Sequence, residues 1–213
     1  MPDVVTLRLE HTFSDAMDRL RAMGWDPPVP GSSRDRFDVV SRHVVARRDG
    51  EPVGMVRITP GGRSVLATWA GRPLPLASAP QLVELTRGVV ARDLRRLGIY
   101  RLLMLETMLR IARLGGTVAL AAIEPDFPGR PFLASIGFAH IGSPLVLRDA
   151  PRSGVFAQPI VVAVSDHLRA EWRRAWQRQV DSLRANLWTV DSDLETTVEV
   201  AAPARPSPAL ATA

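Results

Sequence analysis

The sequence predicts an α+β fold in which a central sheet of mixed, mostly antiparallel direction is flanked by helices. Strand-like and helix-like runs alternate along the whole chain of 213 residues. The apolar run TVALAAI, residues 117–123, lies between Gly-Gly and Pro and is typical of a buried central strand. Two strand-like runs flank Asp49-Gly50, a pair that favours a tight hairpin and so an antiparallel partner.

The first half of the chain predicts a strand, a helix and a hairpin. VVTLRLEHTF, residues 4–13, has the composition of a strand. A helix follows over 14–25, with Ser14 as its N-cap. The Pro-rich residues 26–33 predict a loop, and 42–60 predict the hairpin. The Pro- and Gly-rich residues 61–80 predict a loop that contains a short strand or helix.

The second half predicts two βα units and a long terminal helix. We expect a strand over 83–90, a helix from Gly98 over 98–113 and a strand over 117–123. A short helix that ends at Gly137 follows over 129–138, then two late strands over 139–148 and 155–165, and a long helix over 165–188. Apolar residues form one stripe of the last helix, namely Leu168, Trp172, Trp176, Val180, Leu183 and Leu187. We expect one domain over 1–199 and a disordered Ala/Pro-rich tail over 200–213.

Composition excludes several classes of protein. The chain has no Cys, which excludes disulfides and thiolate chemistry. Its four His are scattered without metal-ligand spacing, so no metal is expected. No apolar run approaches a membrane span and no secretory signal opens the chain, so we expect a cytoplasmic protein without stable membrane insertion. All 27 basic residues are Arg, yet the net charge of +5 and the single Tyr do not indicate nucleic-acid binding.

The segment between the strand at 83–90 and the following helix has the features of an anion site. A helix start presents free backbone N–H groups and the positive end of the helix dipole. Four arginines surround this turn, and Gly98 lets a phosphate approach the backbone closely: Arg92, Arg95, Arg96 and Arg101. An ordinary basic helix start gives the same pattern.

Two motifs then resemble the GCN5-related N-acyltransferase (GNAT) superfamily, whose R/Q-x-x-G-x-G/A turn binds the phosphates of a pantetheine thioester. Arg95 and Gly98 match that turn, and PFLASIGF resembles a later segment of the superfamily. Tyr100 stands where Gly or Ala is usual. Leu133 stands where many members carry the Tyr that protonates the leaving thiolate, so the usual acid is missing.

An ordered set of residues further resembles one branch, the acyl-homoserine-lactone (autoinducer) synthases that make quorum-sensing signals. The set consists of Trp25, D-x-x-D at Asp35 and Asp38, R-x-x-P at Arg57 and Pro60, and E-x-x-R at Glu84 and Arg87. The chain departs from the branch in its first helix, where the branch has an Arg and an aromatic residue and this sequence has Asp15 and Arg19 near those places. This resemblance implies a transfer of an acyl group from acyl carrier protein or coenzyme A to the amine of S-adenosylmethionine, with no tightly bound cofactor.

The resemblance assigns a role to each candidate residue. It implies catalytic roles for Glu84, Asp35, Asp38 and Arg87, and substrate binding by Trp25 and Arg57. It implies donor binding, through the phosphopantetheine arm, by Arg95, Arg96, Gly98, Tyr100 and Arg101. From their apolar character we expect an acyl pocket formed by Leu102, Leu105, Phe132 and Ile136, and an ordinary hydrophobic core is the alternative for the same residues.

The chemistry of these residues suits acyl transfer, but other interpretations stay open. A carboxylate is needed to take the proton of the attacking amine, and Glu84 is the best candidate because it lies in an otherwise apolar strand. A structural ion-pair network of the same residues is an alternative. So are an N-acetyltransferase or N-acyltransferase that acts on an amino acid or another small amine with acyl-CoA, and an acyl-binding protein without turnover.

Overall fold

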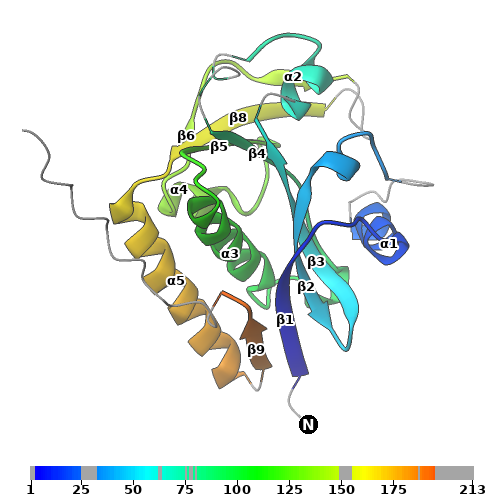
Figure 1. Cartoon of the computed structure of the whole chain (residues 1–213), viewed down its shortest axis with the longest axis vertical. Coiled ribbons are helices and arrows are strands. Elements are labelled where there is room, and N and C mark those ends of the chain that lie inside the picture. Colours follow the sequence, from blue (N-terminus) through cyan, green and yellow to red (C-terminus); the bar gives the residue numbers. More distant parts are fainter. Residues whose placement is uncertain are drawn as a thin grey trace, which may run out of the picture.

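A nine-stranded sheet separates two layers of helices (Figure 1). The computed structural model describes residues 3–24, 33–61, 64–74, 76, 79, 81–148, 155–186 and 188–194. The strands are β1 (Asp3–Glu10), β2 (Arg42–Arg48), β3 (Glu51–Pro60), β4 (Leu82–Val90), β5 (Val118–Ile123), β6 (Ala139–His140), β7 (Leu145–Leu147), β8 (Val155–Ala163) and β9 (Trp188–Ser192). The helices are α1 (Asp15–Gly24), α2 (Val65–Ala70), α3 (Ile99–Arg113), α4 (Arg130–Ser135) and α5 (Asp166–Ala185), with 3-10 turns η1 (Asp38–Val40) and η2 (Arg92–Leu94).

The predicted α+β class is confirmed, and so is the mixed sheet. Its order is β6-β8-β5-β4-β3-β2-β1-β9, with β7 paired to β8 off this path. β4 runs parallel to β5 and β1 parallel to β9, while the other pairs are antiparallel. The predicted hairpin turn is present, because Asp49 and Gly50 both have positive φ, 52° and 83°.

Two predictions about the C-terminal part were wrong. The expected strand 139–148 is divided into β6 and β7, because Gly142 turns the chain with φ 62° and Pro144 cannot donate a ladder hydrogen bond. The last helix, capped by Ser165 as expected, ends at Ala185 rather than at residue 188. Trp188 instead opens β9, a strand that the sequence did not indicate and that pairs with β1.

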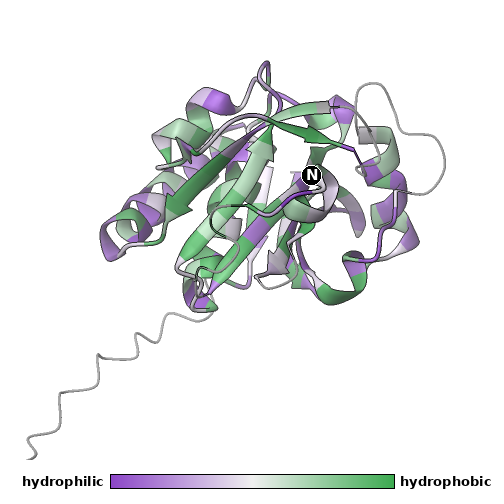
Figure 2. Cartoon of the chain, turned by 90° about the horizontal axis from the view of Figure 1, so that it is seen from above, coloured by the Kyte–Doolittle hydropathy of each residue, from purple (hydrophilic) through white to green (hydrophobic). Residues whose placement is uncertain are grey.

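The two faces of the sheet are covered differently. On one face α3 and α5 enclose the main core, in which Leu102, Leu105 and Ile136 are at most 5% exposed. On the other face α1 and α2 pack on separate, smaller clusters. Figure 2 shows apolar strands between helices whose outer surfaces are polar. Along β3 and β4, Arg57, Thr59, Glu84 and Thr86 all point to the α1 and α2 face. The tail 200–213 lies outside the described residues.

Candidate functional site

A buried arginine lies at the centre of the candidate site. Arg57 on β3 is 0% exposed and donates through Nη1 to Asp35 Oδ1 at 2.7 Å and to Asp38 Oδ1 at 3.0 Å. Its Nε donates to Thr86 Oγ1, across the ladder on β4, at 2.9 Å. Its Nη2 is buried and has no hydrogen-bond partner among the described residues. One N–H donor of this fully buried guanidinium is therefore available to another hydrogen-bond acceptor.

Helix α1 supplies a second buried arginine. Arg21 binds Asp38 through both terminal nitrogens, at 2.9 and 3.0 Å. It lies inside because Met17, Leu20, Arg21 and Gly24 follow helical spacing and share the buried face. Arg19, which lies near the first-helix position that the resemblance considered, is exposed. The sequence held the necessary signal, since an arginine on an apolar helical face needs a buried partner.

A bulge in β4 aims the third arginine. Arg87 has φ 59°, and the pairing of β3 with β4 shifts between Met55 and Arg57. Arg87 Nη2 consequently reaches Asp35 Oδ2 at 2.5 Å. Trp69 of α2 covers both guanidinium groups, at 4.9 Å from Arg87 and 5.7 Å from Arg57. Sequence reasoning missed Trp69, because its contact requires the tertiary approach of α2.

These groups form what we call the arginine–aspartate cluster: Arg21, Asp35, Asp38, His43, Arg57 and Arg87. Burial alone would raise the pKa of Asp38, but hydrogen bonds from His43 and Arg21 outweigh it and hold that pKa far below its usual range. Burial lowers the pKa of His43, which favours its neutral form. Among the six residues of the cluster, three guanidinium groups face two carboxylates.

Glu84 lies beside this cluster without a hydrogen bond to it. It is 1% exposed, and its Oε2 accepts from the backbone N–H of Leu66 at the start of α2, at 2.9 Å. Its Oε1 is buried without a hydrogen-bond partner among the described residues. Burial raises the pKa of Glu84, although hydrogen bonds from the Ser64 side chain and from the backbone N–H groups of Leu66 and Val65, and the charge of Arg57, act in the opposite direction. Arg57 and Glu84 are diagonal neighbours across the β3–β4 ladder, for which a separation of about 7–8 Å is usual.

The turn before α3 is formed, but protein groups occupy parts of it. Gly98 has φ 87° and is the N-cap of α3, without a side-chain cap. This φ favours glycine, and Nε2 of Gln179 on α5 would lie 2.2 Å from a Cβ at this position. The guanidinium of Arg95 donates to backbone carbonyls of Val90 and Gly24. Arg96 and Arg101 are exposed, and Arg101 lies over the ring of Phe132 at 5.7 Å.

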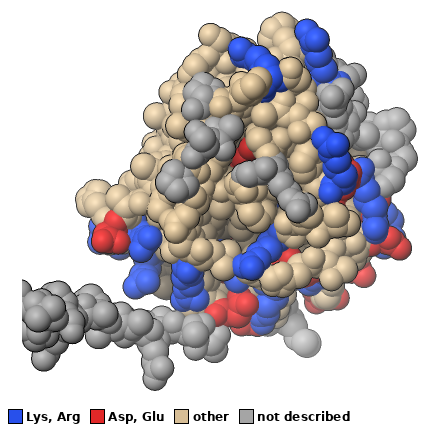
Figure 3. Space-filling model, turned by 45° about the horizontal axis from the view of Figure 1, so that its top comes forward, with Lys and Arg blue, Asp and Glu red and all other residues tan. Residues whose placement is uncertain are grey.

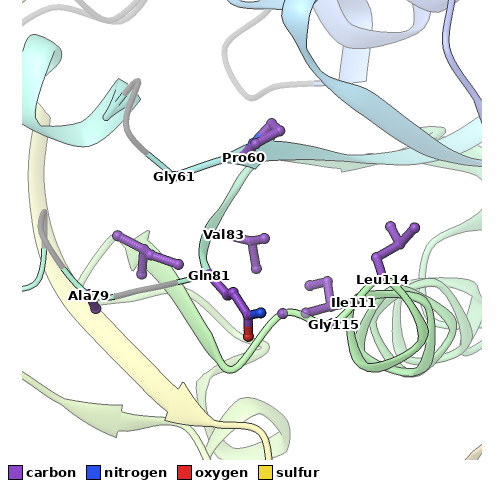
Figure 4. Close-up of a pocket in the computed structure, with 10 residues that line it drawn as sticks. Pro60, Gly61, Ala79, Gln81, Val83, Ile111, Leu114 and Gly115 are labelled. Atoms are coloured by element: carbon purple, nitrogen blue, oxygen red, sulfur yellow. The ribbon is translucent and has the colours of Figure 1, made fainter.

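The residues of the expected acyl pocket pack within the main core. Leu102, Leu105 and Ile136 are buried, and Phe132 is half-buried beside Tyr100. A cavity of about 490 Å³ lies elsewhere, at the end of α3 away from Gly98 (Figure 4). Its lining includes Pro60, Val83, Ile111 and Leu114 and carries no charged side chain. Figure 3 shows this end of the molecule coming forward, with arginines around its edge rather than at its centre.

The remaining predictions concern Trp25, metal ligands and membrane spans. Trp25 lies outside the described residues. No group of three or more potential metal ligands occurs in the described part of the chain. Over the same residues, none of the helices combines the length and hydropathy that a membrane span requires.

Comparisons with known proteins identify the fold. The model of the acetyltransferase (GNAT) family matches residues 9–138. A search of curated proteins found no match to the sequence. Among solved structures, the CoA-dependent acyl-homoserine lactone synthase MesI is similar at 20% identity and a TM-score of 0.57, over 81% of this chain and 95% of that one.

Other structures share the fold at comparable distance. An acyl-CoA N-acyltransferase from Pseudomonas aeruginosa is 16% identical, with a TM-score of 0.56 over 74% of this chain and 99% of its own. BjaI, a CoA-dependent acyl-homoserine lactone synthase solved with SAM and isopentyl-CoA, is 14% identical, with a TM-score of 0.55 over 89% of this chain and 93% of its own. Because these identities are low, the likeness establishes the fold and not the substrate. The family model covers more than half of the sequence, and the chain belongs to the GNAT acetyltransferase family as an N-acyltransferase of that type.

Proposed function

We propose that this N-acyltransferase transfers an acyl group from a carrier-protein or coenzyme A thioester to the amine of S-adenosylmethionine and so forms an acyl-homoserine lactone. The observation that carries the proposal is the pair of unpartnered buried atoms on neighbouring strands, Arg57 Nη2 and Glu84 Oε1. An α-amino acid presents one carboxylate and one amine a few ångströms apart. The unpaired Nη2 of Arg57 suits the carboxylate, and Glu84 suits the amine.

Glu84 has the properties of a general base for the first step. The substrate ammonium has to lose a proton before its nitrogen attacks the thioester carbonyl, and a carboxylate whose pKa burial raises accepts that proton more readily. The nitrogen forms the amide and the thiolate leaves with the electron pair of the broken C–S bond. In the second step the substrate carboxylate attacks the carbon next to the sulfonium, closes the lactone and releases methylthioadenosine.

Arg87 and Arg57 would hold the carboxylate in both steps. Asp35 binds both guanidinium groups and Asp38 binds that of Arg57, so their forks are fixed before substrate arrives. Trp69 adds a rigid surface behind them. This preorganisation supports a role for Asp35 and Asp38 in orienting the two arginines.

On the donor side, the turn before α3 supports a ligand with one phosphate better than one with a pyrophosphate. Arg95 is already engaged with two backbone carbonyls, and Gln179 covers Gly98. The exposed Arg96 and Arg101 are suited to the acidic surface of a carrier protein.

The test is the mass of the product. Purified protein is incubated with S-adenosylmethionine or with free amino acids, and with one acyl group supplied on carrier protein or on coenzyme A. Acyl-homoserine lactone together with methylthioadenosine is the expected result. Acylated amino acids would assign the same site to an amino-acid acceptor, since the described residues provide partners for an α-amine and an α-carboxylate. Transfer to neither class of acceptor would overturn the proposal.

A further inference from the structure

A buried histidine on β2 lies beside the central arginine of the cluster. His43 is 0% exposed and is the direct cross-strand neighbour of Arg57 in the antiparallel pair of β2 and β3. Directly opposite residues place their side chains on the same face of a sheet, with Cβ atoms about 4.5–5.5 Å apart. The imidazole ring is therefore next to the guanidinium whose Nη2 has no partner among the described residues.

His43 and Arg57 meet at one oxygen atom of Asp38. Oδ1 of this carboxylate accepts from Nη1 of Arg57 at 3.0 Å and from Nη2 of Arg21 at 2.9 Å. Nε2 of His43 lies 3.4 Å from the same oxygen. Three donors share the lone pairs of one oxygen atom, and the contact of His43 is the longest of the three. The place of this oxygen depends on all three side chains, and the orientation of Arg57 depends on that oxygen.

The surroundings of the ring determine which of its nitrogens carries the proton. Asp38 is ionised and can only accept, so Nε2 of His43 has to be the donor and Nδ1 of the neutral ring is then an acceptor. Nδ1 is buried without a hydrogen-bond partner among the described residues. Burial and the nearby charges of Arg21 and Arg57 lower the pKa of His43, so the neutral form prevails at pH 7.

This position favours a donor without charge. Like charges on directly opposite residues of two strands destabilise the pair, and a cation at position 43 would be opposite Arg57. Phe13 packs against the same ring, with 5.2 Å between the two centroids, and the guanidinium of Arg21 lies 4.0 Å over the Phe13 ring. This packing holds the imidazole with its Nε2 toward Asp38.

We propose that His43 is a positioning residue of the acceptor site, whose Nε2–H orients Asp38, which in turn orients Arg57 toward the carboxylate of the acceptor. This inference rests on the proposed acyl transfer, because it assumes that Arg57 binds that carboxylate. His43 itself touches neither the substrates nor the reacting atoms. Its loss should weaken binding of the acceptor and spare the donor, since the proposed donor site at Gly98 involves neither Asp38 nor Arg57.

Two amide variants separate the hydrogen bond from the packing. A glutamine amide nitrogen reaches about as far as Nε2 of histidine, whereas that of asparagine reaches only about as far as Nδ1. His43→Gln therefore keeps a neutral N–H donor for Asp38, and His43→Asn does not. The KM for the acceptor should rise on the order of ten-fold in His43→Asn and stay within about three-fold in His43→Gln. kcat should change little, because Arg57 holds the carboxylate in both the ground state and the transition state.

Nuclear magnetic resonance provides a readout that needs no turnover. At pH 7 the ring of His43, assigned by the absence of its signals in His43→Gln, should carry its proton on Nε2. The Nε–H signal of Arg57, assigned through Arg57→Lys, should move more in His43→Asn than in His43→Gln. If both results are obtained and no acceptor is acylated, the positioning role stands and the proposed reaction fails. A proton on Nδ1, or equal changes of the acceptor KM or of the Arg57 signal in the two amide variants, would refute the role of His43.

Discussion

Two buried ionic networks lie on opposite faces of the sheet, and they differ in whether their hydrogen bonds are complete. In what we call the Glu106 network, Oε1 of Glu106 accepts from Arg110 and Ser192, while Oε2 accepts from Trp176 at 2.8 Å. Both oxygens are satisfied, and they join α3, α5 and the end of β9. The arginine–aspartate cluster with Glu84 instead leaves Arg57 Nη2 and Glu84 Oε1 unpaired within the described residues.

The comparison separates a structural network from a site. A buried polar atom without a partner costs free energy, about 1–3 kcal/mol, unless a water molecule or a ligand completes its bonding. Each network has a carboxylate whose pKa burial raises, Glu106 in one and Glu84 in the other. Burial and a raised pKa therefore do not distinguish the two networks. The networks differ in that Arg57 Nη2 and Glu84 Oε1 are unpaired within the described residues, whereas both oxygens of Glu106 accept hydrogen bonds.

The largest expected effect is the loss of catalysis in Glu84→Gln. The amide oxygen still accepts from Leu66 N–H, so the fold is kept, but the side chain no longer takes a proton. We expect kcat/KM to fall by about 10²–10⁴-fold, measured as release of free thiol from the donor. The thermal midpoint should stay within a few degrees. Unchanged turnover in this variant would remove Glu84 from the site and weaken the contrast with Glu106.

The next effect concerns stability alone. Glu106→Ala leaves the indole N–H of Trp176 without its partner in the core and leaves Arg110 with Asp193 as its remaining acidic partner among the described residues, and we expect the free energy of unfolding to fall by about 3–5 kcal/mol in urea titrations. Activity per folded molecule should be retained. Glu171→Ala serves as a control, because this carboxylate on α5 faces solvent and pairs with Arg174 at the surface. If Glu106→Ala abolished turnover in folded protein, the Glu106 network would not be purely structural, and its contrast with the candidate site would fail.

A smaller effect is expected in the pH dependence of stability. The pKa values of Asp35 and Asp38 are lowered on folding, so these residues stabilise the fold above their unfolded pKa of about 4. That contribution is lost as pH falls through the folded values. The contribution of Glu106 to stability changes with pH in the opposite direction. Its pKa is raised on folding, so it stabilises the fold at low pH, and this contribution is lost as pH rises through the folded pKa.

Urea midpoints measured from pH 7 downward test these signs. Asp38→Asn should be less stable at pH 7 and should lose less stability than the unaltered protein on acidification. Glu106→Gln should show a smaller decline than the unaltered protein as pH rises from acid. Parallel curves for the unaltered protein and Asp38→Asn would contradict the assignment.

Much of the fold was predictable because local signals agreed with each other. Asp49-Gly50 fixed the hairpin, Ser165 the start of α5, and Gly98 the start of α3. β9 was not predictable, because five residues that pair with the distant β1 carry little local signal. The end of β9 is held by the hydrogen bond from Ser192 to Glu106, and the Glu106 network joins residues of three separate elements.

The candidate site was predictable in part. The motif residues Asp35, Asp38, Arg57 and Arg87 lie together as the family resemblance implies. Arg21 was overlooked although its helical phase shows it on the buried face. The contact of Trp69 with the arginines could not be foreseen from the sequence, because it depends on the tertiary approach of α2.

The most direct test is calorimetric titration of S-adenosylmethionine into the unaltered protein, Glu84→Gln and Glu106→Gln, at a temperature where all three are folded. Occupation of the unpaired atoms predicts binding by the unaltered protein and by Glu106→Gln with similar Kd. It also predicts binding at least about ten-fold weaker in Glu84→Gln, because one charged hydrogen bond to the amine is lost. Equal affinity in all three proteins, or a loss confined to Glu106→Gln, would contradict the assignment of the acceptor site.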